Sequence, residues 1–438
     1  GTDVTTGDYN TAVGSYALEN TTTGSKNVAI GDRALDANST GSSNTALGQG
    51  ALGSNTTAND NTAVGNDALG ANTIGVDNVA VGNQALEDNT EGDNNVALGY
   101  KALGDNTTAD NNTGIGRSAL RVNTTGYANA AVGANALDAN TTGYRNTAVG
   151  KDSLGSTTTG YMNVAVGRDA LLSNTTGYSN VAVGGDSLDA NTTGNANIAI
   201  GHAALTANTT ADANVAVGYN AMQDNTTGSQ NTAAGHEALA NNTTAANNTA
   251  FGCRAMLGNP STAGTGGNNV AIGHSALRVT TSGVSNTAVG YSAMEAQTTG
   301  GYNTAIGHKT LESSTTGEHN VAVGHEAGND ITTGYYNTLV GSRAGDVMTT
   351  GSINVAIGMD ALGACTTGNY NVAVGYASGK AVTTATNSVA MGYNSLLNTT
   401  TGDDNTAIGS GSMYTCSEGE YNTGVGMNSL HALTTGDY

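Results

Sequence analysis

Five histidines share one position in a repeating pattern, and imidazole is the side chain here best suited to hold a metal ion. Each of the five directly follows a glycine: His202, His236, His274, His308 and His325. His308 and His325 are 17 residues apart, which is one period of the repeat. No column of Cys, Asp or Glu accompanies them, so the sequence predicts an exposed polar corner and no metal site.

The cysteines and hydroxyl side chains offer little further chemistry. Cys253, Cys365 and Cys416 are too few for a disulfide framework. Cys365 and Cys416 lie three periods apart, about 14 Å at the spacing of stacked strands, which is beyond disulfide reach. We therefore expect buried free thiols. Ser and His occur without a third catalytic partner, so the sequence predicts no enzyme active site and no cofactor.

Two further patterns concern glycosylation and calcium binding. Asn-Thr-Thr matches the N-glycosylation acceptor pattern at several places: Asn55, Asn106, Asn123, Asn174 and Asn191. In a eukaryotic secretory protein this would give a sugar-coated edge, whereas in a bacterial or phage protein it would be coincidence. Asp60, Asp77 and Asp93 do not follow the Gly-Gly-x-Gly-x-Asp pattern of calcium-binding β-rolls.

All of these residues belong to copies of one repeated pattern. Near copies of Asn163-Val164-Ala165-Val166-Gly167 occur 25 times, 17 residues apart except at one break. Numbered from its Asn, each period reads N-(T/V)-A-(V/I/L)-G-x-x-A-L-x-x-N-T-T-G-x-x. The histidine column is place six, and Asn174 stands at place twelve.

The alternation at places two to four is typical of a strand. Val164 and Val166 share one face of an extended segment and are expected to fill its buried side. Gly167 and Gly177 mark two corners, where each is expected to supply a conformation closed to other residues. The leg that contains Leu171 is either extended or includes a helical turn. The fold class is therefore all-β, a parallel β-solenoid (β-roll) of about 25 coils.

The remaining fixed places indicate close packing. Asn163 is expected to form an amide ladder with its copies on neighbouring coils. Ala165, on the face opposite the valines, must lie close either to the opposite leg or to another chain. Three aliphatic side chains per coil are a small core for 17 residues, which favours an oligomer with solenoids side by side.

The array changes once. Four extra residues, with the only proline, interrupt the spacing between Asn248 and Asn269. After this point place twelve turns from Asn to mostly apolar residues, which we interpret as an edge that loses water and gains a neighbour. The predicted division is 1–259, a loop at 260–268, and 269–438. Gly replaces Leu at place nine three times in the later segment, and the apolar place twelve is expected to fill that volume: Gly328, Gly345 and Gly379.

Composition limits the partners. The net charge is −21 and only 13 residues are Lys or Arg, so a nucleic acid is excluded as the obvious partner. No apolar run is long enough to span a membrane. The chain begins and ends within repeats, so we expect a fragment of a longer protein.

The segment Asn387-Ser388-Val389-Ala390-Met391-Gly392 and the many Asn-Val-Ala-Ile-Gly copies resemble the head repeat of trimeric autotransporter adhesins. The 17-residue pattern also resembles repeat regions of phage and bacterial tail-fibre-like proteins. The adhesin resemblance implies a left-handed roll, three chains in one stalk or head, and attachment to surfaces such as host matrix or glycan. The period here is longer than that of the adhesins, and no neck, coiled coil or anchor is present.

We therefore expect a non-enzymatic structural protein, a rigid extracellular fibre, stalk or filament on a cell surface or virion, with self-association as a homotrimer or filament. Two alternatives remain. Ice binding would use the hydroxyl rows of places thirteen and fourteen, such as Thr175 and Thr176. A calcium-dependent surface protein would instead need the ion to fold.

Overall fold

The computed structural model describes residues 5–262 and 264–436. It forms two units, Gly1–Asn214 and Val215–Tyr438, and each unit is a parallel β-solenoid with one short strand per coil. The predicted fold class is confirmed. The described residues include no helix, and hence no apolar helix of membrane-spanning length.

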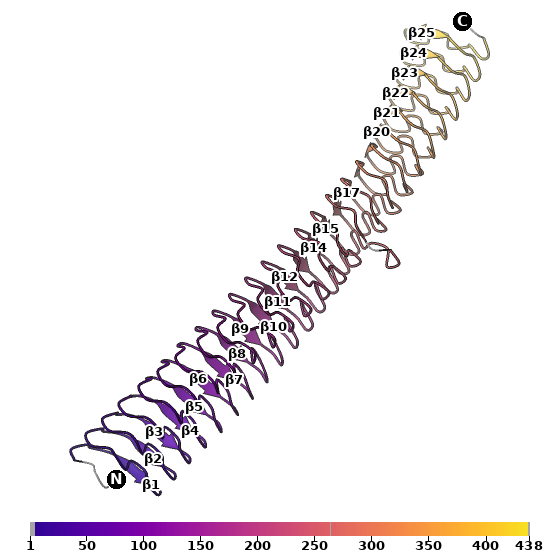
Figure 1. The fold of residues 1–438 in the computed structure, drawn as a ribbon. Coiled ribbons are helices and arrows are strands. Elements are labelled where there is room, and N and C mark those ends of the chain that lie inside the picture. The colour runs from indigo at the N-terminus through magenta and orange to yellow at the C-terminus, as the bar shows by residue number, and fades with distance from the viewer. Residues whose placement is uncertain (1–4, 263, 437–438) are drawn as a thin grey trace. The chain divides into compact units, whose positions relative to one another are not determined.

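The strands of each unit follow one another in sequence order (Figure 1). The first unit contains β1 (Thr11–Val13), β2 (Val28–Ile30), β3 (Thr45–Leu47), β4 (Thr62–Val64), β5 (Val79–Val81), β6 (Val96–Leu98), β7 (Thr113–Ile115), β8 (Ala130–Val132), β9 (Thr147–Val149), β10 (Val164–Val166), β11 (Val181–Val183) and β12 (Ile198–Ile200). The second unit contains β13 (Val215–Val217), β14 (Thr232–Ala234), β15 (Thr249–Phe251), β16 (Val270–Ile272), β17 (Thr287–Val289), β18 (Thr304–Ile306), β19 (Val321–Val323), β20 (Thr338–Val340), β21 (Val355–Ile357), β22 (Val372–Val374), β23 (Val389–Met391), β24 (Thr406–Ile408) and β25 (Thr423–Val425).

The register repeats the sequence period. Within each unit every strand pairs in parallel with the next, so that Val164 lies beside Val181 and Ala165 beside Ala182. The one exception in offset is β15 and β16, where Thr249 pairs with Val270 across the four-residue insertion. The insertion therefore leaves the sheet register intact, because its extra residues lie outside the strands.

The leg opposite the strand is neither extended nor helical. It consists of hydrogen-bonded turns in which non-glycine residues at places seven and nine adopt left-handed backbone angles, as in Asp169 (φ 57°) and Leu171 (φ 54°). The Leu171 side chain is fully buried. Its burial offsets the cost of a left-handed conformation, which is usually unfavourable for a residue with a branched side chain.

Glycine occupies the two corners for different physical reasons. Gly167 has φ of 142°, and a Cβ there would lie 2.4 Å from the carbonyl oxygen of Gly184, so both conformation and space require glycine. Gly177 does not have a left-handed φ, so the prediction for this corner is wrong in its reason. At this corner a Cβ on Gly177 would lie 2.3 Å from Asn174 Oδ1 and 2.5 Å from the Gly194 carbonyl oxygen, so local space favours glycine. Other coils accommodate a buried alanine at the same place, Ala58 and Ala211.

Alanine at place three packs against the opposite leg of the same solenoid. Gly114 stands at this place, and a Cβ added to it would lie 3.2 Å from Leu103 Cγ and 3.2 Å from the carbonyl oxygen of Ala119. A methyl group therefore fills the available space, and a larger side chain needs room from elsewhere. Of the two neighbours proposed for this column, the opposite leg is the correct one.

Leu339 is the one large residue at place three, and two glycines make room for it. A Cβ at Gly328 would lie 2.7 Å from Leu339 Cδ1, and one at Gly345 would lie 3.1 Å from Leu339 Cδ2. The apolar place twelve also reaches these glycines, since the same Cβ at Gly328 would lie 3.1 Å from Ile331 Cδ1. The predicted exchange of volume between places nine and twelve is confirmed.

Place twelve is buried on both sides of the insertion, which corrects its interpretation as an edge that loses water. Asn174 in the first unit and Ile331 in the second are both fully buried. In the first unit the amides form a ladder, in which Asn191 Nδ2 donates to Asn174 Oδ1 at 2.9 Å and to the Gly194 carbonyl at 3.0 Å. The column therefore changes from an amide ladder to apolar packing, while its exposure stays the same.

The amide ladder is interrupted at Thr157, and replacing this residue by Asn should stabilise the fold. Asn140 Oδ1 is buried and has no hydrogen-bond partner, because Thr157 follows it in the column. The Thr157→Asn amide would donate to that oxygen, so we expect the free energy of unfolding to rise by about 1 kcal/mol. Urea denaturation followed by circular dichroism measures this change. Ser156→Asn, at an exposed neighbouring place, is the control and should have no effect. An equal effect of both substitutions, or destabilisation by Thr157→Asn, would contradict the ladder.

Candidate functional surface

The asparagine at place one is a buried structural residue, as predicted. The Asn163 backbone N–H donates to Asn146 Oδ1 at 3.0 Å, and Asn163 Nδ2 donates to the Gly177 carbonyl at 2.8 Å. Asn163 Oδ1 in turn accepts the Asn180 backbone N–H at 3.0 Å. One amide thus joins three successive coils and also ties the strand to the far corner of its own coil.

The buried face of the strand is the alanine face, so the prediction that the valines are buried is wrong. Ala165 is fully buried, whereas Val166 is 37% exposed and Val164 is half-buried. Alternation alone could not assign the inner face, because all three residues are apolar. The interior between the two legs is too narrow for valine and accepts alanine.

This reversal leaves an outward apolar surface on each unit, which we call the outer sheet face and define as places two and four of the strands. Place four is Val, Ile, Leu, Ala, Phe or Met in all 25 strands, and place two is Thr or Val in all but two. Exposure at place four is 38% for Val149, 40% for Ile200 and 40% for Ile357. Neighbouring side chains repeat at about 4.8 Å between coils and about 6.7 Å along a strand.

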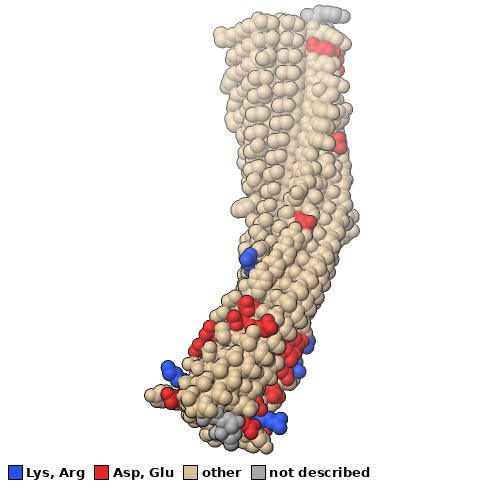
Figure 2. Space-filling view, turned by 60° about the vertical axis from the view of Figure 1, so that its left-hand side comes forward, with Lys and Arg blue, Asp and Glu red and all other residues tan. Residues whose placement is uncertain are grey.

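Charged side chains lie on the turn side of the coil and at the corners, and places two and four carry none. Arg168 pairs with Asp186 on the next coil at 2.9 Å, and Arg343 pairs with Asp360 at 2.8 Å. In the view of Figure 2 the charged side chains stand in separate groups beside long rows of uncharged ones. The exposed Arg168–Asp186 pair contributes little to stability, whereas Asp360 is buried. The separation matters here because it leaves the outer sheet face uncharged.

Several aspartates at place ten are partly covered by neighbouring coils. Burial raises the pKa of Asp36, Asp138 and Asp346 above the usual range of an aspartate. Asp36 lies with Arg33 and Glu87 around a hollow of about 530 Å³ on the turn side of the first unit. The acidic surface of the chain is thus concentrated away from the sheet.

The threonine rows do not present two free sets of hydroxyls. Thr175 Oγ1 donates to the Thr192 carbonyl at 3.0 Å, and Thr192 Oγ1 donates to the Thr209 carbonyl at 3.0 Å. The hydroxyls of place thirteen therefore stabilise the stacking of coils, and Thr176 at place fourteen belongs to the exposed row. The pair of hydroxyl rows expected for ice binding is reduced to one.

The Asn-Thr-Thr asparagines are inaccessible in the folded chain. Asn55 is fully buried, and its Nδ2 donates to Asn38 Oδ1 at 3.0 Å and to the Ala58 carbonyl at 3.1 Å. Asn106, Asn123, Asn174 and Asn191 are fully buried in the same column. A sugar on these amides is incompatible with the fold, so no glycosylated edge forms here.

Aromatic side chains stack in columns, which was not among the predictions from the sequence. Tyr127, Tyr144, Tyr161 and Tyr178 stand at place sixteen of successive coils, with ring centroids 4.9 to 5.1 Å apart. The signal was present in the sequence, because identical places in a repeat become neighbours in a solenoid. At place six His308 and His325 stack at 5.1 Å and are exposed, so the predicted exposed polar corner is confirmed.

No protein-family model matches the chain, and no curated protein matches it. The fold itself defines the class, a tandem-repeat parallel β-solenoid with a narrow core and an outward apolar sheet face.

The cysteines are free thiols, and two are fully buried, as predicted. Burial raises the pKa of Cys365 to about 11. Below that pH the folded chain keeps this thiol protonated, whereas the unfolded chain ionises it from about pH 9.

A thiol reagent at pH 8 should therefore modify half-buried Cys253 and spare Cys365 and Cys416 until the protein is unfolded in urea. Native Cys253→Ser protein should not react, and equal reaction of all three thiols in the native protein would contradict the buried placement.

Proposed function

We propose that this chain is a non-enzymatic structural protein, a rigid segment of an extracellular fibre, stalk or filament that self-associates through the outer sheet face. The observation that carries the proposal is the apolar residue at place four in all 25 coils, exposed to solvent in most of them. A solvent-facing column under no constraint would contain polar residues. An apolar surface repeated in this way favours burial against another surface of the same kind.

The area of the face supports self-association. Twelve strands in the first unit give a row about 58 Å long at the spacing of parallel strands, and two rows of side chains are about 10 Å wide. Each unit thus offers about 580 Å², so two copies that meet through the face of one unit would bury about 1,160 Å² in total. Biological interfaces bury more than about 1,000 Å² in total. The face carries no charged side chains, so copies of the chain can approach it closely.

The homotrimer rests on the resemblance to adhesin heads, in which three rolls form one stalk. Location outside the cell or on a virion, and attachment to a host glycan or matrix, rest on the same resemblance. The repeat is compatible with such a role because places one, three and five are nearly constant, whereas the exposed corner places six, seven, sixteen and seventeen vary from coil to coil. Constant places maintain the rod of each unit, and variable corners provide the surface for recognition.

Charges placed on the outer sheet face should prevent association. The triple variant Val132→Lys, Val149→Lys, Val166→Lys puts three ammonium groups on adjacent coils at exposed positions, so the fold should survive while the interface fails. Sedimentation equilibrium should give a multiple of 43.2 kDa for the unmodified chain and at least tenfold weaker association for the variant.

The matched control places the same charges on the exposed threonine row of the same coils. Thr142→Lys, Thr159→Lys, Thr176→Lys should associate like the unmodified chain. Circular dichroism checks that all three proteins are folded. A folded, unmodified chain that sediments at 43.2 kDa, or a valine variant that assembles normally, would overturn the proposal.

A further inference from the structure

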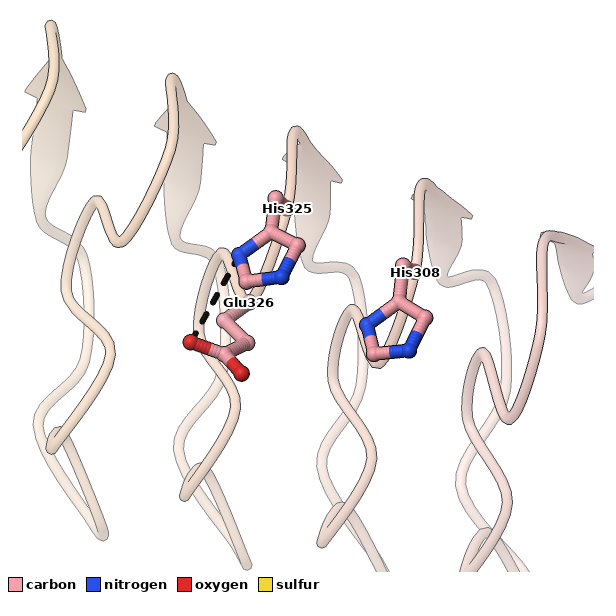
Figure 3. A group of neighbouring side chains, drawn as sticks. All are labelled: His308, His325 and Glu326. Atoms are coloured by element: carbon pink, nitrogen blue, oxygen red, sulfur yellow. Dashed lines mark ion pairs between the residues drawn. The ribbon is translucent and has the colours of Figure 1, made fainter.

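Two histidines and a glutamate converge on the turn side of the second unit, just after β18 and β19. His308 and His325 stand at place six of adjacent coils, and Glu326 follows at place seven. One nitrogen from each ring and one carboxylate oxygen all lie within 4.8 Å of one another. Figure 3 shows the two rings side by side, with the Glu326 carboxylate reaching toward His325 Nδ1 at 3.5 Å.

The backbone fixes this arrangement. The Gly324 N–H donates to the Ile306 carbonyl at 2.9 Å, and the Glu326 N–H donates to the His308 carbonyl at 2.9 Å. The two hydrogen bonds hold the coils in register directly beside the three side chains. Glu326 has φ of 56°, and its side chain lies beside the His325 ring. The backbone is thus set before any ligand arrives, while the side chains remain free to adjust.

Neighbouring cations pair with other carboxylates. Lys309 Nζ lies 3.2 Å from Glu312, and Arg343 lies 2.8 Å from Asp360. Among the described residues, Glu326 forms its ion pair with His325. Glu326 can therefore serve as a metal ligand without breaking an arginine or lysine pair.

The other His-Glu dipeptide of the column shows what is specific to this cluster. His236 Nδ1 lies 3.7 Å from Glu237, but Arg254 Nε occupies the same carboxylate at 2.8 Å. The ring stacked on His236 is Tyr219. His274 likewise stacks on Tyr291. The register of the coils is enough to stack rings at all of these sites. Only the cluster of His308, His325 and Glu326 combines two stacked imidazoles with a carboxylate that has no arginine or lysine partner among the ion pairs of the described residues.

We propose that His308, His325 and Glu326 bind one divalent transition-metal ion, for which zinc is the best match. Two imidazole nitrogens and one carboxylate oxygen are a donor set that zinc uses with a water molecule in the fourth position. Bond lengths of about 2.0 to 2.2 Å require the ligand atoms to move together by about 1 Å or more. The side chains of His325 and Glu326 are 55% and 35% exposed, so rotation about their side-chain bonds can supply this movement. The ion would join two coils through their side chains.

Zinc titration of the untagged chain of residues 1–438 tests the site. Isothermal calorimetry should find one site per chain whose affinity falls at least tenfold in each of His308→Gln, His325→Gln and Glu326→Gln. Cobalt(II), used as a spectroscopic probe, should give the visible absorption of a tetrahedral nitrogen- and oxygen-ligated ion, which the three variants lose.

His274→Gln is the matched control, because it removes an exposed histidine from the same column without a histidine on the adjacent coil. It should bind zinc like the unmodified chain. The substituted side chains are exposed or half-buried, so circular dichroism should be unchanged in all four variants. The proposal is overturned if the unmodified chain binds zinc no better than the double variant His308→Gln, His325→Gln, or if His274→Gln weakens binding equally.

Discussion

The asparagine amide at place one is the interaction on which each solenoid unit depends. A polar side chain buried between two legs would be costly if its hydrogen-bonding groups had no partners. Asn163 Nδ2 donates to Asn146 Oδ1 on the coil before and to the Gly177 carbonyl of its own coil, and Asn163 Oδ1 accepts the backbone N–H of Asn180 on the coil after. Equivalent bonds recur along the column, in which Ser388 is the one replacement for Asn, so one residue type largely fixes the spacing of coils, the register of strands and the closure of each turn.

The narrow interior follows from this closure. Because Asn163 Nδ2 reaches the carbonyl of Gly177, the strand and the far corner are close together, and alanine is the largest residue that place three generally accepts. Leu171 enters from the turn side by adopting a left-handed backbone angle. The larger aliphatic residues of the strand are then left outside. The outer sheet face is thus a consequence of a core made of small side chains and amides, and it supports the proposal that copies of the chain meet there.

Much of this was predictable from the sequence. The 17-residue period predicted the coil, and the alternation predicted the strand at places two to four. The glycines at place nine indicated that apolar residues at place twelve, such as Ile331, fill the space left by the missing leucine. The inner face of the strand was assigned wrongly because the larger aliphatic residues at places two and four were expected inside, although many coils carry Thr at place two, as at Thr147. The width of the interior, which admits alanine and not valine, is a tertiary property. Burial of Asn174 was missed for a related reason, since an amide is expected at the surface unless a ladder satisfies it.

The grouping of His308, His325 and Glu326 depends on side-chain direction as well as spacing. The sequence places the two histidines one period apart, but the histidine and glutamate at places six and seven also occur at His236 and Glu237, where Arg254 intervenes. The two cases differ in the ring stacked on the histidine, which is Tyr219 for His236 and His308 for His325, and in the positions of neighbouring cations. Periodicity therefore identifies which residues become neighbours, and the structure is needed to show which neighbours are available.

Hydrogen exchange in Asn163→Asp protein, measured by mass spectrometry, tests the role of the amide most directly. The substitution removes two donor hydrogens and buries a charge, and we expect backbone amides of residues 146–180 to exchange at least a hundredfold faster, equivalent to about 3 kcal/mol. Asn111→Asp, at an exposed place where other coils carry Asp60 and Asp77, should leave exchange unchanged. Exchange in Asn163→Asp as slow as in the unmodified chain would contradict the account.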